Sequence, residues 1–310
     1  MQQRYVGNSG LRVSALSLGT MSWGAETDEQ DASELLQTFL NGGGRHIDTS
    51  ASYGDGAAEA LIGSLLGDVV ARTEVSISTK AGMTTAGGRR RIDTSRGALL
   101  NGLDASLARL GTDYVDVWLA EAWDGNVPLD ETLSAMEFAV RTGRARYAGI
   151  ANFAGWQAAK AAALARFPLV AAQAEYSLLN RAPEPELIPA VEDAGLGLMA
   201  WGPLGRGVLT AKYRGGIPSG SRAASATEAS YVERYLGEAP TRTVDAVCMA
   251  AKGLGRTPLD VSLSWLLAQP GVATAVVGAR TPAQLKEVLD AQLVPLPPEI
   301  SLALEDVSAA

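Results

Sequence analysis

Cysteine and histidine, the soft metal ligands, are nearly absent from this sequence of 310 residues. It contains one cysteine, Cys248, and one histidine, His46. A lone cysteine cannot form an internal disulfide bond, and one cysteine with one histidine does not provide the ligand set of a zinc or iron site. We therefore expect a protein without a bound metal ion.

Basic charge and long apolar runs are also scarce. The formal net charge is -8, and only Arg89, Arg90 and Arg91 form a basic run, which we interpret as a solvent-exposed loop. A nucleic-acid partner usually requires a clustered basic surface, so we expect none. No apolar stretch approaches the roughly 18 residues that cross a bilayer, and Met1 to Arg4 does not lead into the apolar run of a secretion signal. These absences predict a cytoplasmic protein that does not enter a membrane.

Apolar residues, in contrast, are plentiful and spread along the whole chain. Hydrophobic residues make up 47% and charged residues 19% of the sequence, which is typical of a protein with a sizeable core. No shift in composition marks a linker. Because α/β barrels of this length commonly form one domain, we expect residues 1–310 to form a single barrel domain.

Short strand-like runs alternate with helical patterns through most of the sequence. Leucines at helical spacing, such as Leu99, Leu103 and Leu107, give helices with one buried face. The alternation predicts an α/β fold, a (β/α)8 TIM barrel rather than an open sheet, because no glycine fingerprint follows the first strand. The expected strands are 15–18, 45–48, 74–79, 114–119, 145–150, 169–174, 196–201 and 273–277. Other expected helices are 32–40, 57–66, 129–141, 156–164 and 185–194.

Three further features lie outside this repeat. The turn-rich residues Gly7 to Gly10 predict an N-terminal β-hairpin over 4–13. Extra helices are expected over 241–254, 258–268 and 297–307. The segment from Pro203 to Pro240 is longer than ordinary connections, so we expect a flexible cover over the barrel mouth; its far half could equally be a decorative insertion.

Three side chains near two neighbouring strand ends suggest proton transfer. Asp48 ends one expected strand, Tyr53 lies in the loop that follows, and Lys80 ends the next strand. A lysine beside a phenol stabilises the phenolate, so we expect Lys80 to lower the pKa of Tyr53. The alternatives are structural: Asp48 as a turn former, Tyr53 as a packing residue, and Asp48 with Lys80 as a buried ion pair.

Polar and aromatic residues recur at the ends of the other expected strands, where barrels place their functional groups. The order of these segments resembles the aldo-keto reductases, which are NADPH-dependent oxidoreductases built on a (β/α)8 barrel. The segments are Asp48-Thr49-Ser50 with Tyr53-Gly54, Ser78-Thr79-Lys80-Ala81-Gly82, Asn152-Phe153, Gln173-Ala174-Glu175-Tyr176-Ser177, Gly202-Pro203-Leu204-Gly205-Arg206-Gly207 and Gly278-Ala279-Arg280.

By this resemblance, Tyr53 is the general acid, and Lys80, held by Asp48, is the cation beside it. The resemblance also implies that Asn152 and Gln173 hold the nicotinamide carboxamide of NADPH. Trp201 would stack on the nicotinamide ring, and Arg280 would face the 2'-phosphate with Gln284 nearby. The remaining expected cofactor-binding residues are Gly202, Pro203, Leu204 and Gly278. Two residues depart from the family pattern: Val288 replaces an asparagine that contacts adenine, and Gly202 replaces a serine that contacts the pyrophosphate.

The most important departure is Glu121, which stands where the family usually has a histidine that donates to the substrate carbonyl. An ionised glutamate would repel the oxyanion that develops, so we expect Glu121 to be protonated, through an apolar pocket or the charge of Asp48. A glutamate here is similar to the steroid 5β-reductases, which reduce the double bond of a conjugated enone.

Three functions therefore stay open: reduction of a conjugated enone, ordinary carbonyl reduction, and a silent NADPH-binding protein like the potassium-channel β-subunits. The substrate candidates range from small aldehydes and sugars to unsaturated ketones of bacterial secondary metabolism, including nucleotide-linked deoxysugars. An oligomer is possible.

Overall fold

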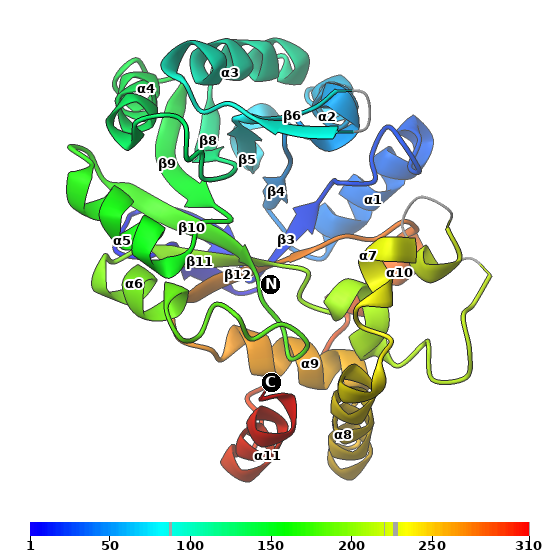
Figure 1. Cartoon of the computed structure of the whole chain (residues 1–310). Helices are drawn as coiled ribbons and strands as arrows, with labels where there is room; N and C mark the ends of the chain where they lie inside the picture. Colours follow the sequence, from blue (N-terminus) through cyan, green and yellow to red (C-terminus); the bar gives the residue numbers. More distant parts are fainter. Residues whose placement is uncertain (87–88, 220, 226–228, 310) are drawn as a thin grey trace.

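Eight parallel strands close into a barrel surrounded by helices, as the sequence predicted (Figure 1). The computed structural model describes residues 1–86, 89–219, 221–225 and 229–309. Each strand lies within two residues of its expected bounds. Around the barrel the order is β10 (Leu169–Glu175), β11 (Gly197–Trp201), β12 (Val272–Val277), β3 (Leu16–Gly19), β4 (His46–Asp48), β5 (Ser76–Ala81), β8 (Val115–Ala120) and β9 (Ala145–Ala151).

Helices pack their apolar faces against the outside of the barrel and bury a continuous hydrophobic core. Two helices outside this ring, α8 (Glu238–Leu254) and α11 (Pro298–Ser308), pack against each other and confirm the expected extra helices. None of the helices in the described ranges combines the length and hydropathy needed to cross a membrane. The helices around the barrel are α1 (Glu29–Asn41), α2 (Ala57–Leu65), α3 (Arg96–Leu110), α4 (Leu129–Arg141), α5 (Gly155–Leu164), α6 (Leu187–Asp193), α9 (Pro258–Leu267) and α10 (Pro282–Leu289).

Local signals set several of these helix ends. The Thr257 hydroxyl accepts a hydrogen bond from the Asp260 N–H at the start of α9, and Pro258 occupies the first turn. Gly111 follows α3 with a φ of 61°, a left-handed conformation that glycine adopts without strain.

The expected N-terminal hairpin is present and closes the bottom of the barrel. Its strands, β1 (Gln3–Tyr5) and β2 (Arg12–Ser14), pair antiparallel. Beside them, Val6, Leu11 and Val13 are buried in one cluster with strand residues such as Val117 and Met199. The bottom of the barrel is therefore filled with apolar side chains, and polar groups gather at the opposite, carboxyl end of the strands.

The loop expected at Arg89 to Arg91 is wrong, whereas the expected solvent exposure is confirmed for Arg90 and Arg91. These residues lie in β7 (Arg89–Ile92), which pairs antiparallel with β6 (Met83–Ala86) after β5. The two strands contain threonines and arginines instead of alternating apolar residues, so the sequence carried no strand signal there. The hairpin also has a distant contact, because Arg90 Nη2 donates to the Tyr231 hydroxyl at 2.6 Å.

The long segment from Pro203 to Pro240 contains short helical turns and is held at the carboxyl ends of the strands. Its elements are η3 (Gly205–Thr210), η4 (Arg222–Ala224) and α7 (Ala229–Glu233). Glu175, at the end of β10, accepts hydrogen bonds from Arg206 at 3.2 Å and from the Tyr235 hydroxyl at 2.9 Å, and it pairs with Arg234. Figure 1 shows α7 beside the barrel opening. These contacts agree with the expected cover, and its flexibility stays a prediction.

The single histidine lies inside the barrel wall at the start of β4. His46 is fully buried, with Nδ1 2.8 Å from Ser76 Oγ and Nε2 3.2 Å from Ser78 Oγ. Burial lowers the pKa of His46 to about 4, and Lys80 adds to this, although the negative charges of Asp48 and Asp116 oppose it. The imidazole is therefore neutral at pH 7.

The His46 imidazole should stay neutral in the folded protein until the pH falls to about 4, whereas in the unfolded chain it takes up a proton near pH 6.5. Because the unfolded state binds this proton first, the stability that His46 contributes should be lost as the pH falls from 6.5 towards 4. An NMR titration of the tag-free protein tests this directly, since only one imidazole contributes. A folded-state midpoint near 6.5 would contradict the prediction.

Candidate active site

Most of the expected site residues meet at the carboxyl end of the barrel. Asp48, Lys80, Gln173 and Trp201 lie on their strands, and Glu121 and Asn152 immediately follow β8 and β9. Because parallel strands end at the same face, residues far apart in the sequence become neighbours there. Hydrogen bonds and close contacts join these residues to Tyr53 in two neighbouring groups, one around Asp48 and one around Glu121.

Asp48 is the centre of the first group. Its Oδ2 accepts a hydrogen bond from Lys80 Nζ at 2.8 Å, and its Oδ1 accepts from Ser78 Oγ at 2.6 Å and from Gln173 Nε2 at 2.8 Å. Both Asp48 and Lys80 are almost fully buried. The strand register explains the arrangement, because Asp48 pairs with Ser78 on β5, two residues before Lys80.

Lys80 joins this carboxylate to the phenol of Tyr53. Its ammonium donates to the Thr49 carbonyl at 2.8 Å and to the Tyr53 hydroxyl at 3.4 Å. Burial opposes the charge on Lys80, but the charges of Asp48, Tyr53 and Glu121 and the hydrogen bond to Asp48 together outweigh burial, and the pKa of Lys80 is raised. Lys80 is therefore a fixed positive charge beside Tyr53.

Lys80 lowers the pKa of Tyr53, as expected, but a larger effect of burial in the opposite direction was not foreseen. Burial raises the pKa of Tyr53 to about 12, and Lys80 offsets only part of that effect, while Asp48 and Glu121 add to it. The sequence showed the neighbouring ammonium but not how deeply the hydroxyl lies. Tyr53 is therefore a protonated phenol at neutral pH, with a cation in place to receive its anion.

The backbone after β4 brings Tyr53 towards Lys80. The Ala51 N–H donates to the Lys80 carbonyl at 3.3 Å, and this hydrogen bond holds the loop after β4 against β5. Tyr53 then begins a 3-10 turn (η1, Tyr53–Gly56) in which Gly54 has a φ of 57°. A β-branched or bulky residue is strained at this φ, so Gly54 permits the turn that follows Tyr53.

Glu121 is the centre of the second group and is 3% exposed. Its Oε1 lies 2.7 Å from Ser52 Oγ, and its Oε2 lies 2.9 Å from Ser50 Oγ. Burial raises the pKa of Glu121, and Asp48 adds to this, whereas Lys80 and the two serine hydroxyls oppose it. The direction agrees with the expected protonated state, although the carboxyl group contacts serines and not the apolar pocket considered for it.

Asn152 and Trp201 adjoin this group. Asn152 Nδ2 donates to the Glu121 carbonyl at 2.9 Å, and Trp201 Nε1 donates to Asn152 Oδ1 at 3.1 Å. Asn152 has a φ of 58°, a left-handed conformation that asparagine adopts more readily than most residues. Both side chains are partly open to solvent at the mouth of the barrel.

The other expected cofactor residues form a separate set at the ends of β11 and β12. Gly202, Pro203 and Leu204 follow β11, and Gly202 has a φ of 65°. The Arg280 backbone N–H donates to Gln284 Oε1 at 3.1 Å, and its guanidinium pairs with Glu26 at 3.5 Å.

Sequence reasoning missed Arg222, which lies beside this second set. A Cβ built on Gly278 would lie 3.7 Å from Arg222 Nη2, so the Arg222 guanidinium lies next to the residue that follows β12. Arg222 lies in the Pro203 to Pro240 segment, whose sequence has no periodic pattern to indicate where its side chains point. The positive charge near Arg280 is therefore larger than the sequence indicated.

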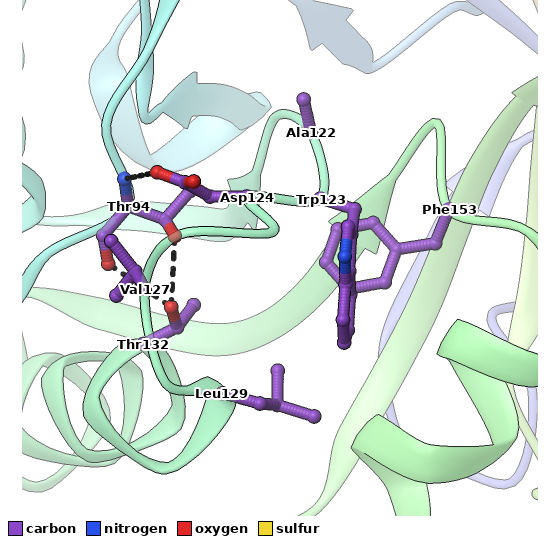
Figure 2. A pocket seen from close by; sticks show the side chains of 8 residues that line it. All are labelled: Thr94, Ala122, Trp123, Asp124, Val127, Leu129, Thr132 and Phe153. Carbon is purple, nitrogen blue, oxygen red and sulfur yellow. Dashed lines mark hydrogen bonds between the residues drawn. The ribbon is translucent and has the colours of Figure 1, made fainter.

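Sequence reasoning also missed an aromatic wall formed by Trp123 and Phe153, near Glu121. Figure 2 shows Trp123 and Phe153 side by side along a small cavity, with Leu129 below it. Their ring centroids are 5.5 Å apart, and Trp156, which is exposed, lies 5.2 Å from Trp123. Such a wall suits the apolar part of a small molecule at the mouth.

Comparison with known proteins gives a consistent result. The model of the aldo/keto reductase family matches residues 15–308. An L-glyceraldehyde 3-phosphate reductase of Escherichia coli (strain K12) is 36% identical over 94% of this chain and 87% of its own length. A probable voltage-gated potassium channel subunit beta of Oryza sativa subsp. japonica is 34% identical over 99% of this chain and 96% of its own.

A solved structure agrees with these sequence matches. The crystal structure of the thermostable aldo-keto reductase Tm1743 with the inhibitor epalrestat superposes with a TM-score of 0.80 at 31% identity, and the match covers 99% of this chain and 100% of that one. The expected resemblance is confirmed: this chain belongs to the aldo/keto reductase family, oxidoreductases that act on small-molecule carbonyl compounds and generally use NAD(P)H.

Proposed function

We propose that the protein is an NADPH-dependent reductase in which Tyr53 is the general acid and a protonated Glu121 is a second hydrogen-bond donor to the substrate oxygen. The observation that carries the proposal is the contact of 3.4 Å between the Tyr53 hydroxyl and Lys80 Nζ, with Lys80 bound to Asp48. This arrangement holds a positive charge where a phenolate would form.

The residues at the mouth fit a nicotinamide dinucleotide. Asn152 at the mouth and Gln173 below it carry amide groups that match a carboxamide, although Gln173 is buried and its Nε2 donates to Asp48. The partly exposed indole of Trp201 offers a flat surface for the ring. Arg280, near Gln284 and Arg222, offers guanidinium groups for phosphate oxygens, with Gly202, Pro203, Leu204 and Gly278 as the adjoining backbone. When bound, the reduced cofactor supplies a hydride.

Tyr53 supplies the proton that accompanies this hydride. Its oxygen accepts a hydrogen bond from Lys80, so its own hydrogen is left for the oxygen of a ligand. A pKa of about 12 keeps Tyr53 protonated until negative charge develops on the substrate oxygen. Lys80 then stabilises the phenolate, and Asp48, through its hydrogen bonds to three side chains, keeps Lys80 in place.

Glu121 decides between the two reductive reactions. A neutral Glu121 and Tyr53 can donate to one carbonyl oxygen, and one such donor contributes about 3 kcal/mol to lowering the barrier. Because a carboxyl group is smaller than an imidazole, the carbonyl can sit deeper, which brings a conjugated β-carbon over the nicotinamide and favours an enone. Ordinary carbonyl reduction is the second candidate, favoured by the similarity to an L-glyceraldehyde 3-phosphate reductase.

A cofactor-binding partner protein is the other candidate, and the similarity to a potassium channel subunit beta favours it. In that case the protein binds NADPH without turnover and acts through a partner or an oligomer. The intact contacts among Asp48, Lys80 and Tyr53 favour an enzyme instead, because a silent site does not need them.

Tyr53→Phe should lower kcat by about 10²- to 10⁴-fold, the usual contribution of a general acid, and leave NADPH affinity within about twofold. Steady-state NADPH oxidation and fluorescence titration measure the two quantities. Tyr5→Phe is a matched control, because Tyr5 is 61% exposed on the opposite end of the barrel. Near-normal turnover by Tyr53→Phe would remove the proposed acid, and NADPH binding without turnover of any substrate would favour the partner protein.

Glu121→His should lower reduction of the double bond of an α,β-unsaturated ketone by about 100-fold, because the larger ring moves the carbonyl outward, while reduction of simple aldehydes rises. Product analysis by mass spectrometry and NMR shows which bond has been reduced. Glu121→Gln, which keeps a donor of the same size, should retain more of the double-bond activity. Unchanged double-bond reduction by Glu121→His contradicts the enone assignment, and a wild-type protein that reduces only aldehydes supports the carbonyl candidate.

A further inference from the structure

The two carboxyl oxygens of Glu121 and the hydroxyl oxygens of Ser50 and Ser52 form a closed ring of contacts. Glu121 Oε1 lies 2.7 Å from Ser52 Oγ, Glu121 Oε2 lies 2.9 Å from Ser50 Oγ, and the two serine oxygens lie 2.9 Å from each other. All three distances are within the range of O–H···O hydrogen bonds. Ser50 is fully buried and Glu121 nearly so, which leaves little room for water to complete the ring.

The number of hydrogens decides the protonation state of this ring. Three O···O contacts need three hydrogens, and the two serine hydroxyl groups supply two. An ionised Glu121 supplies none, so one contact would place two oxygens together with no hydrogen between them. A protonated Glu121 supplies the third, and the ring then closes in either direction, with each hydroxyl group donating once.

The backbone supports the same count at Ser50. Its Oγ also accepts a hydrogen bond from the Ser52 N–H at 3.1 Å. In the closed ring Ser50 Oγ therefore uses its one hydrogen and both lone pairs. With Glu121 ionised, both serine hydroxyl groups donate to the carboxylate. No hydrogen is then left between the Ser50 and Ser52 oxygens, which lie 2.9 Å apart.

We infer that Ser50 and Ser52 are positioning residues that hold Glu121 in its neutral form by closing this ring of three hydrogen bonds. Neither serine was among the residues expected to form the site. They lie in the loop that carries Tyr53, so one turn of chain both presents the phenol and keeps the second acid protonated.

The charges around Glu121 come from the neighbouring strand ends. Lys80 favours the ionised form of Glu121, whereas burial and Asp48 oppose it, and Tyr53 is the other titratable group that interacts with the carboxyl. Two serine hydroxyls that both donate to the carboxyl also favour the ionised form, but in the closed ring one of them accepts a hydrogen bond from Glu121 instead. Lys80 donates to Asp48, Thr49 and Tyr53 and not to Glu121. The ammonium thus donates to other groups, and among the described residues the carboxyl oxygens of Glu121 have the two serine hydroxyls as hydrogen-bond partners.

The neutral Glu121 carboxyl group is the second hydrogen-bond donor of the proposed mechanism, and its catalytic role rests on the function proposed above. Ser52 is partly exposed at the mouth, so a ligand oxygen that enters between Tyr53 and Glu121 can replace Ser52 as the acceptor of the Glu121 hydrogen. The protonation state of Glu121 can nevertheless be tested without turnover, so a failure here is distinct from a failure of the proposed reaction.

Infrared difference spectroscopy tests the inference. Subtracting the spectrum of Glu121→Gln from that of the full-length wild-type protein at pH 7 should leave the carbonyl stretch of one protonated carboxylic acid. The glutamine variant is a suitable reference, because its amide places a donor nitrogen and an acceptor oxygen where the two carboxyl oxygens lie and can close the same ring. Carboxylate bands in place of the carbonyl stretch would overturn the inference.

The serine variants test what holds the proton. The pH midpoint of the carbonyl band should fall by at least one unit in Ser52→Ala, which removes the acceptor, and stay near the wild-type value in Ser52→Thr, which keeps the hydroxyl. Ser50→Ala should act like Ser52→Ala, and if its buried site does not tolerate the change, the partly exposed Ser52 still decides the question. If the midpoint rises or is unchanged in Ser52→Ala, the serines donate to an anion and the inference is wrong.

Discussion

The buried ion pair between Asp48 and Lys80 is the interaction on which the rest of the site depends. Removing two charges from water is expensive, and a buried pair is tolerated only where further hydrogen bonds satisfy its remaining atoms. Ser78 and Gln173 supply these bonds to Asp48, and the Thr49 carbonyl and Tyr53 hydroxyl supply them to Lys80. The partners come from several parts of the chain, so the pair is complete only when the barrel is closed.

The barrel gives this pair its surroundings. Apolar side chains from the N-terminal hairpin fill one end, which leaves the carboxyl ends of the strands as the place for polar chemistry. Two excursions, the β6–β7 hairpin and the segment after β11, meet through Arg90 and Tyr231. Arg206 connects them to the site, since its guanidinium lies 4.8 Å from the Tyr231 ring and 5.6 Å from the Trp201 ring.

How much could be predicted from the sequence depended on the kind of signal. The eight barrel strands are short apolar runs separated by helical spacing, and their positions were predicted within two residues. Asp48, Lys80 and Glu121 were found because they end such runs. The β6–β7 hairpin was missed, since its threonines and arginines carry no apolar alternation.

Features that depend on burial or on neighbours distant in the sequence could not be predicted from the sequence. The sequence placed Lys80 beside Tyr53 but did not show that burial would raise the phenol pKa to about 12. In the sequence, Ser50 and Ser52 are small loop residues, and only the fold places Glu121 against them.

The most direct test of the proposed site is a crystal structure with NADP+ and an unreactive ketone bound. We expect the nicotinamide ring to stack on the Trp201 indole and the ketone oxygen to lie within hydrogen-bonding distance of Tyr53 Oη. A cofactor bound elsewhere, or a ketone out of reach of Tyr53, would contradict the proposed function.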